Sequence, residues 1–270
     1  MRITFLGGGN MASALIGGLR EKGFSAAGMQ VVERNGEVRD ALTERFGVRC
    51  TDSFDAASLN CEVLALAVKP QQMREAVAPL IGKLEAQLVV SIAAGLRVAD
   101  IARWLGGHQR IVRTMPNTPA LIGAGITGLY AAPGVDAEQR QLADTILTAV
   151  GSTIWVEDEA QVDAVTAISG SGPAYVFYFI EALESAALEL GFDLPSARKL
   201  ALETTLGAAR LAARSNDAPA VLRERVTSKG GTTEAALRSL ENDAVRAAIS
   251  RAAKAAAARG RELGEQLGQD

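Results

Sequence analysis

The hydroxyl- and glycine-rich segment near the carboxyl end of the chain carries the side chains best suited to holding a small polar ligand. It runs Ser228-Lys229-Gly230-Gly231-Thr232-Thr233 and leads into residues with helical spacing. Such residues ahead of a helix are first of all an N-cap, but this segment has more of them than capping requires. Hydroxyls beside the free N–H groups of a helix N-terminus would suit a carboxylate. The segment is therefore our candidate for a substrate-acid pocket.

A second chemical signal lies at the amino end, in Gly7-Gly8-Gly9-Asn10-Met11-Ala12. This Gly-x-Gly-x-x-Ala turn follows a strand-like run and opens a helix. Gly7 permits the tight turn, Gly9 lets a pyrophosphate approach the backbone, and Ala12 permits close packing of helix on strand. The turn predicts dinucleotide binding at a helix N-terminus, although an ordinary glycine-rich turn can share the pattern.

The end of the second expected strand reads Glu33-Arg34-Asn35 and should distinguish NAD from NADP. An acid there bonds the ribose 2′-hydroxyl, whereas an arginine pairs with a 2′-phosphate. Arg34 followed by Asn35 favours NADP(H), and Glu33 keeps NAD(H) open. A solvated, charged strand end is the plain alternative.

Three later segments end expected strands at the edge where open α/β sheets bind ligands. They are Ala67-Val68-Lys69-Pro70, Ala93-Ala94-Gly95 and the proline-stiffened loop 113–120, from which we take Asn117 as a candidate cofactor contact. Lys69 could lie over the cofactor, or equally be a surface residue before a helix with Pro70 in its first turn. Turn chemistry explains the second segment almost as well as proximity to a ligand does.

Composition narrows the class of function. The 28 basic and 31 acidic residues give a net charge of -3 without a basic block, so we expect no nucleic-acid partner. With His108 as the single histidine, we expect neither a metal site nor a Ser-His-Asp triad. The apolar runs fall far short of the roughly 20 residues of a membrane helix. Two unpaired cysteines and no signal pattern favour a cytoplasmic protein that acts on a small molecule.

The order of apolar runs predicts an α/β fold. Over the first half, short β-branched runs alternate with amphipathic stretches, as in a parallel sheet covered by helices. The expected strands cover 2–6, 29–33, 63–68, 88–92, 111–114, 126–130 and 153–156, and the expected helices cover 10–22, 36–46, 70–81, 98–105 and 136–150. Strand-like runs end after residue 157. We therefore predict an N-terminal Rossmann dinucleotide-binding domain over 1–157 and an all-α dimerisation domain over 158–270.

The helical half has the pattern of an association domain. Apolar residues fill every position from 174 to 180, which predicts a segment buried all round. A domain of this size often buries such a helix against a second copy of itself. The Ser-Gly-Ser-Gly-Pro run at 169–173 should bend or restart the helix.

Together, these motifs resemble the pyrroline-5-carboxylate reductase family. The glycine turn, Val-Lys-Pro-Gln at 68–71, the loop at 113–119, the run at 169–175 and the Gly-Gly-Thr-Thr segment span nearly the whole chain, and 219–241 follows the family's more specific C-terminal signature. The resemblance implies reduction of 1-pyrroline-5-carboxylate to L-proline by NAD(P)H, the last step of proline synthesis. It also implies a homodimer interlocked through the helical domain and often assembled further, for instance into a decamer.

The resemblance also assigns residues to roles, and with Arg34 and Asn35 we expect NADP(H) as the preferred cofactor and NAD(H) as possible. The cofactor set is Gly7, Gly9, Asn10, Met11, Ala12, Arg34, Asn35, Ala67, Val68, Lys69, Pro70, Ala93, Ala94, Gly95 and Asn117. Ser228, Gly230, Gly231 and Thr233 would hold the substrate. Because a protonated imine is already electrophilic, the protein mainly supplies position. We expect Thr233 to be the catalytic residue at the ring nitrogen, with Ser228 and the two glycine amides on the carboxylate.

Two departures from the family pattern and two other interpretations stay open. Lys229 replaces a common proline, and Phe54 lies near where some members have an adenosine-contacting asparagine, so that contact is not carried over.

A β-hydroxyacid dehydrogenase would place a catalytic lysine on the long interdomain helix, and 162–190 contains none. A non-catalytic NADP-binding sensor would not need the segment 228–233.

Overall fold

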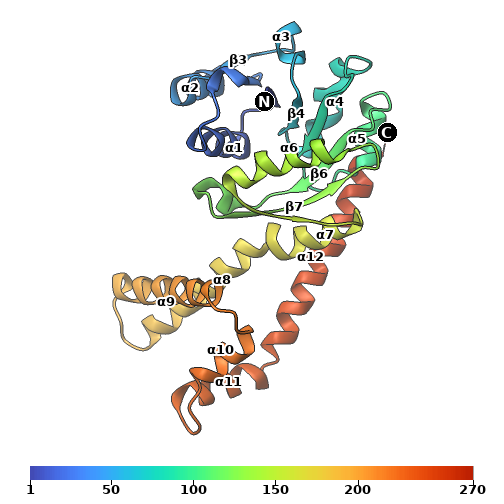
Figure 1. Cartoon of the computed structure of the whole chain (residues 1–270). Coiled ribbons are helices and arrows are strands. Elements are labelled where there is room, and N and C mark those ends of the chain that lie inside the picture. The colour runs from blue at the N-terminus through green and yellow to red at the C-terminus, as the bar shows by residue number, and fades with distance from the viewer. Residues whose placement is uncertain (270) are drawn as a thin grey trace. The chain divides into compact units, whose positions relative to one another are not determined.

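The computed structural model describes residues 1–269, and these form two compact units (Figure 1). Met1–Ser171 and the segment from Ala256 onward make up the sheet unit, and Gly172–Ala255 make up the helical unit. This division falls later than the 157/158 boundary expected from the sequence. The reason is that α7 (Ala160–Val165) packs against the sheet, and the end of the last helix returns to it.

The sheet unit is built on one eight-stranded sheet with the order β3-β2-β1-β4-β5-β6-β7-β8. Strands β1 to β6 are parallel, β7 is antiparallel to β6, and β8 is parallel to β7. The first six follow the order of the doubly wound dinucleotide-binding fold, which confirms the α/β prediction. The strands are β1 (Ile3–Leu6), β2 (Met29–Val32), β3 (Arg49–Thr51), β4 (Val63–Leu66), β5 (Leu88–Ser91), β6 (Ile111–Met115), β7 (Gly125–Ala131) and β8 (Gly151–Trp155).

Helices cover the sheet and make up the whole of the helical unit. Those before α7 are α1 (Asn10–Glu21), α2 (Gly36–Phe46), α3 (Ala56–Leu59), α4 (Met73–Val77), α5 (Val98–Trp104) and α6 (Ala137–Leu147). Those after it are α8 (Gly172–Glu189), α9 (Leu194–Arg214), α10 (Pro219–Arg225), α11 (Thr232–Asn242) and α12 (Val245–Gly268). Within residues 1–269, no helix combines the length and the apolar character needed to cross a membrane.

The central strands form where the sequence is continuously apolar. Every residue of β1, β4 and β5 is buried, as expected for parallel strands covered on both faces. The sequence did not predict β3 or α3, because a three-residue edge strand and a four-residue helix are too short to show a period. The helix expected over 70–81 is broken into a 3₁₀ turn, α4 and a second 3₁₀ turn, with Pro70 and Pro79 in the two 3₁₀ turns.

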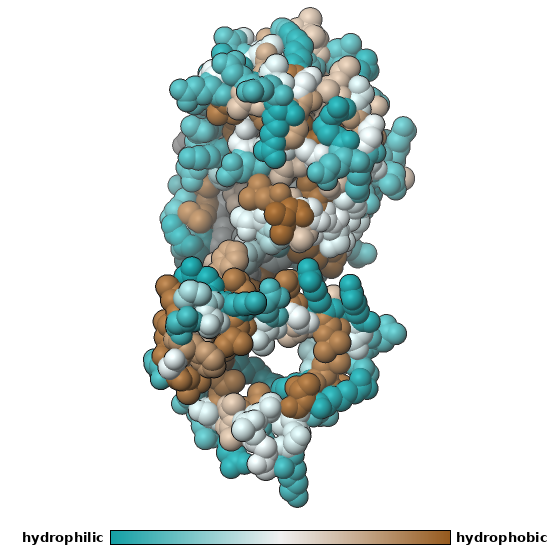
Figure 2. Space-filling model, turned by 90° about the vertical axis from the view of Figure 1, so that its left-hand side faces the viewer, coloured by the Kyte–Doolittle hydropathy of each residue, from teal (hydrophilic) through white to brown (hydrophobic). Residues whose placement is uncertain are grey.

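The helical unit leaves much of its apolar surface uncovered. A π-helical turn over Thr166–Gly170 precedes α8, which agrees with the bend expected at 169–173. No residue of α8 is buried, and Phe177 and Tyr178 are 65% and 75% exposed. One chain by itself therefore does not bury 174–180, and burial of this segment against a second copy stays a prediction. Figure 2 shows the brown, apolar side chains spread over the surface of these helices.

Candidate active site

The glycine turn between β1 and α1 forms an open anion cradle. Gly7 has a φ of 98°, and a Cβ there would lie 2.8 Å from the carbonyl oxygen of Ala67, so only glycine fits. A Cβ on Gly9 would meet nothing within 4 Å. Gly9 is the N-cap of α1 without a capping side chain, and the first N–H groups of a helix lack partners inside it. These N–H groups and the open space above Gly9 fit a pyrophosphate.

The loop after β2 is locked by its own side chains. The Glu33 carboxylate accepts the backbone N–H of Gly8 and of Asn35, each at 2.8 Å. Arg39 Nη1 donates to the carbonyl oxygens of Glu33 and Arg34, also at 2.8 Å. Asn35 Oδ1 accepts the N–H of Val38 and caps α2. Glu33 and Asn35 therefore already hold this loop, and a cofactor contact by Asn35 stays a prediction.

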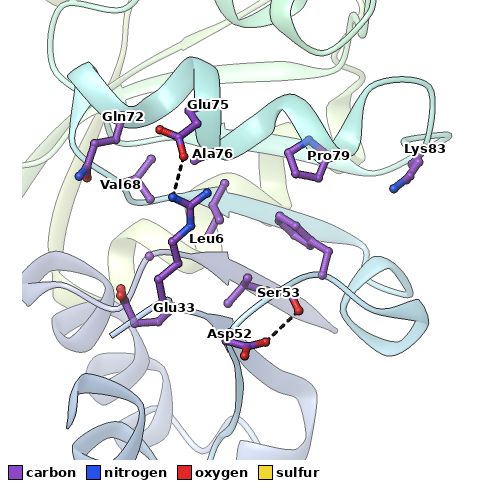
Figure 3. Close-up of a pocket in the computed structure, with 14 residues that line it drawn as sticks. Leu6, Glu33, Asp52, Ser53, Val68, Gln72, Glu75, Ala76, Pro79 and Lys83 are labelled. Atoms are coloured by element: carbon purple, nitrogen blue, oxygen red, sulfur yellow. Dashed lines mark hydrogen bonds and ion pairs between the residues drawn. The ribbon is translucent and has the colours of Figure 1, made fainter. Parts of the chain in front are cut away.

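A cleft of about 330 Å³ lies beside this loop, where β1, β2 and β4 end (Figure 3). Phe54, Val68 and Pro79 give it apolar walls suited to an adenine ring. Across it, Arg34 Nη1 pairs with Glu75 Oε1 of α4 at 2.7 Å. Sequence reasoning missed Glu75 and the wall position of Phe54, because neither lies in a motif.

The segments after β4 and β5 flank the same edge of the sheet. The N–H of Ala67 donates to the carbonyl oxygen of Leu6 at 2.8 Å, which ties the first segment to the glycine turn. Val68 lines the cleft, whereas Lys69 is exposed and is the N-cap of a 3₁₀ turn. In the second segment, Ala93 is buried, Ala94 is exposed and Gly95 has a φ of 82°.

The end of α12 packs against the segment after β5. A Cβ on Gly264 would lie 2.6 Å from the carbonyl oxygen of Gly95. Arg97 pairs with Glu265 at 3.4 Å, and Arg103 Nη2 donates to the carbonyl oxygen of Gly268 at 2.6 Å. No sequence motif indicated this contact between residues so far apart in the chain.

The loop after β6 is fixed to the segment that precedes α8. Asn117 is buried, with Nδ2 donating to the carbonyl oxygen of Ser169 at 3.2 Å and Oδ1 accepting the N–H of Ile126 at 2.9 Å. Arg113, 2% exposed, pairs with Asp163 at 2.6 Å and with Glu159 at 3.1 Å. The Asn117 side chain therefore braces this loop, and its contact with a cofactor stays a prediction.

The substrate candidate forms the loop between α10 and α11. Gly230 has a φ of 75°, and its N–H donates to the Glu234 carboxylate at 2.7 Å, while the N–H of Gly231 donates to the carbonyl oxygen of Ser228 at 3.0 Å. Both amides expected to bind a carboxylate thus donate inside the loop here, and their contact with a substrate stays a prediction. The remaining donors are the Ser228 hydroxyl and the first-turn N–H groups of α11, whose N-cap Gly231 lacks a capping side chain.

The structure therefore gathers the dinucleotide candidates at one edge of the sheet unit. Ser228, Lys229 and Thr233 belong to the helical unit, where Ser228 and Lys229 are exposed and Thr233 is half-buried. His108 is half-buried in the loop after α5, against Gln87. Among residues 1–269, no three His, Cys, Asp or Glu side chains are grouped to hold a metal ion.

Comparison with known proteins gives two family matches. Residues 159–263 match the family model described as pyrroline-5-carboxylate reductase dimerisation. Residues 2–95 match the model described as NADP oxidoreductase, coenzyme F420-dependent.

Relatives match along the full length of the chain. A pyrroline-5-carboxylate reductase of Pseudomonas aeruginosa is 47% identical over 271 residues, covering 99% of this chain and 98% of the relative. The structure of a pyrroline-5-carboxylate reductase from Coxiella burnetii has a TM-score of 0.93 and 43% identity, covering 97% of this chain and 98% of that one. That of a Plasmodium falciparum pyrroline carboxylate reductase with NADP bound has a TM-score of 0.86 and 26% identity, covering 98% of each.

Proposed function

The chain belongs to the pyrroline-5-carboxylate reductase family, and on this premise we propose how its own residues reduce 1-pyrroline-5-carboxylate to L-proline with NAD(P)H. The protein is an oxidoreductase of proline biosynthesis. The observation that carries the residue assignments is the fit of the glycine turn to a dinucleotide: Gly7 closes against Ala67, and the space above Gly9 is open.

The preferred cofactor is NADP(H), with NAD(H) as the weaker alternative. Support comes from the loop after β2, where both carboxylate oxygens of Glu33 already accept backbone N–H groups. Arg34 lines the cleft beside Glu33 and pairs across it with Glu75, and a guanidinium suits a 2′-phosphate. The structure of the Plasmodium falciparum relative contains bound NADP. The N–H groups of Asn10, Met11 and Ala12 would hold the pyrophosphate, and residues 67–70, 93–95 and Asn117 would hold the rest of the dinucleotide.

The substrate carboxylate is held by the Ser228 hydroxyl and the first-turn N–H groups of α11. Gly230 and Gly231 allow the backbone turn of this loop, and the Glu234 carboxylate holds the turn by accepting the N–H of Gly230. The cofactor, when bound, supplies the hydride. Thr233 Oγ1 accepts a hydrogen bond from the protonated ring nitrogen and so orients the imine carbon. The work of these residues is positioning, which suits a chain with one histidine.

The protein assembles as a homodimer through the helical unit. Support comes from the dimerisation family match over 159–263 and from the apolar side chains that one chain leaves exposed on α8 and α9. A larger assembly such as a decamer would add further contacts between dimers. Neither nucleic acid nor membrane is a partner in this proposal. The unpaired Cys50 and Cys61 fit a reducing cytoplasm.

Initial rates of NADPH and NADH oxidation, each with and without 1-pyrroline-5-carboxylate, test this proposal. The expected result is oxidation that depends on the imine, with a larger kcat/KM for NADPH than for NADH. A larger kcat/KM for NADH would contradict the cofactor preference. Binding of NADPH without turnover of the imine would instead favour a sensor.

A further inference from the structure

The acidic side chain that faces Arg34 comes from α4 and not from the loop that carries Arg34. Glu75 Oε1 lies 2.7 Å from Arg34 Nη1, and the dashed line at Glu75 in Figure 3 marks this ion pair across the cleft. The two side chains are 74% and 72% exposed. The pair is therefore open to solvent, and under the proposed function the 2′-substituent of the adenine ribose would meet it.

Three carboxylates line the cleft, and they differ in what they are free to do. Asp52 accepts a hydrogen bond from the Ser53 hydroxyl at 2.8 Å. Glu33 accepts hydrogen bonds from the N–H groups of Gly8 and Asn35, so both of its carboxylate oxygens already hold the glycine turn and the end of β2. Within residues 1–269, the Glu75 carboxylate forms a hydrogen bond with Arg34 alone. Glu75 is thus the carboxylate that can exchange one partner for another when a ligand arrives.

We propose that Glu75, rather than Glu33, sets the ratio in which the enzyme uses NADPH and NADH, by competing with the ribose 2′-phosphate for Arg34. This inference rests on the proposed function, in which Arg34 receives that phosphate. It adds a specificity-determining residue from α4 to a site that sequence motifs assign to the β2 end alone.

Arg34 should leave Glu75 for the ribose 2′-phosphate when NADPH binds. An exposed Lys/Arg–carboxylate pair is worth little, so Arg34 leaves Glu75 at small cost. A 2′-phosphate carries more charge than a carboxylate and can take two guanidinium N–H groups at once. The Glu75 carboxylate then remains beside the phosphate and repels it. Lys83 also lines the cleft and adds a positive charge to it.

The same carboxylate favours the cofactor without the phosphate. A 2′-hydroxyl carries no charge, so it does not displace Arg34 and meets no repulsion from Glu75. The hydroxyl can also donate a hydrogen bond to the Glu75 carboxylate, which is the role usually given to the acid at the β2 end. Glu75 therefore weakens NADPH binding and supports NADH binding.

The variant Glu75→Gln tests this directly, with the ratio of kcat/KM for NADPH to kcat/KM for NADH as the readout. The side chain is exposed, so the fold loses no core packing. The ratio should rise about two- to tenfold, mainly through the two KM values. An unchanged or lower ratio would overturn the proposal. Glu33→Gln is the matched control and should alter both cofactors together, and a shift of the ratio as large as that of Glu75→Gln would also overturn it.

Binding of 2′,5′-ADP, measured by calorimetry, gives a readout that needs no turnover. Glu75→Gln should bind 2′,5′-ADP about two- to tenfold more tightly, and it should bind 5′-ADP no more tightly than the wild type does, since 5′-ADP keeps the 2′-hydroxyl that Glu75 accepts. Equal tightening of both nucleotides would count against competition at the 2′-phosphate.

Arg34→Gln separates failure of this inference from failure of the proposed function. It should weaken 2′,5′-ADP by about tenfold or more and leave 5′-ADP unchanged. If it does not, Arg34 does not hold the phosphate and the proposed cofactor site is wrong. If it does, while Glu75→Gln changes neither affinity nor ratio, only the role of Glu75 is lost. In the Arg34→Gln background, Glu75→Gln should alter the ratio less than it does in the wild-type background, since the competition for Arg34 is gone and only the direct effect of Glu75 on the ribose substituent remains.

Discussion

Gly95 and Gly264 lie so close that a Cβ on Gly264 would sit 2.6 Å from the carbonyl oxygen of Gly95. Gly95 ends the segment after β5 that we assign to the cofactor, and Gly264 lies near the end of α12. The pairs of Arg97 with Glu265 and of Arg103 with the Gly268 carbonyl fasten the same contact. The cofactor edge of the sheet therefore depends on the last turns of the chain.

Enlarging Gly264 should disturb the cofactor site from a distance. Gly264→Ala places a methyl group against the Gly95 carbonyl, so α12 or the segment 93–95 must shift. Overpacking of this kind costs about 1–3 kcal/mol, and we expect a lower Tm with a raised KM for NADPH. The matched control is Gly260→Ala on the same helix, where a Cβ meets nothing within 4 Å. That variant should keep the KM and gain up to about 1 kcal/mol from helix propensity. Identical behaviour of the two variants would disprove the contact.

Gly7 and Gly9 should respond differently to the same substitution. Gly7→Ala combines a φ of 98° with a Cβ 2.8 Å from the Ala67 carbonyl oxygen, so it should lower stability. Gly9→Val has an ordinary backbone and open space, so its Tm should stay close to wild type. Its side chain would occupy the pyrophosphate position, and Kd for NADPH should rise about tenfold or more. Normal NADPH affinity in Gly9→Val would place the pyrophosphate elsewhere.

Thr233→Val should remove the hydrogen bond to the ring nitrogen. Loss of one active-site hydrogen bond lowers kcat/KM by roughly ten- to thousandfold, and the Kd for NADPH should not change. Thr232→Val, the neighbouring residue of the same helical turn, is the matched control and should keep kcat/KM within about threefold of wild type. Comparable losses in both variants would assign the effect to the helix start instead of to the Thr233 hydroxyl.

His108 should contribute to the pH dependence of stability. Its Nε2 lies 2.9 Å from the carbonyl oxygen of Gln87, and burial lowers its pKa below the ordinary 6.5, with Arg110 adding repulsion of the charged form. The unfolded chain therefore binds this proton more readily than the folded one. The contribution is complete above pH 6.5 and is lost as the pH falls through the folded pKa.

Urea unfolding at pH 7.5 and about pH 5.5 measures this contribution. His108→Gln should lose less stability between the two pH values than the wild type does. An equal loss in both proteins would show that His108 is protonated as easily in the folded state as in the unfolded one.

The sequence predicted the α/β fold and the glycine turn because both depend on local chemistry. Fully buried strands such as β4 read as continuous apolar runs, and the tight turn at Gly7 requires glycine. The arrangement of Gly230 and Gly231 could not be predicted, because the use of their N–H groups depends on the path of the loop and on Glu234. The contacts of Glu75 and Gly264 could not be predicted for a related reason, since their partners lie far away in the chain.

Transfer of a labelled hydride tests the central claim most directly. The purified protein is incubated with 1-pyrroline-5-carboxylate and NADPH carrying deuterium at nicotinamide C4, on the face used for transfer, and the product is examined by mass spectrometry and NMR. The account predicts L-proline with one deuterium on the ring carbon next to nitrogen, on the side away from the carboxylate. Unlabelled product, or no proline while NADPH is still bound, would contradict it.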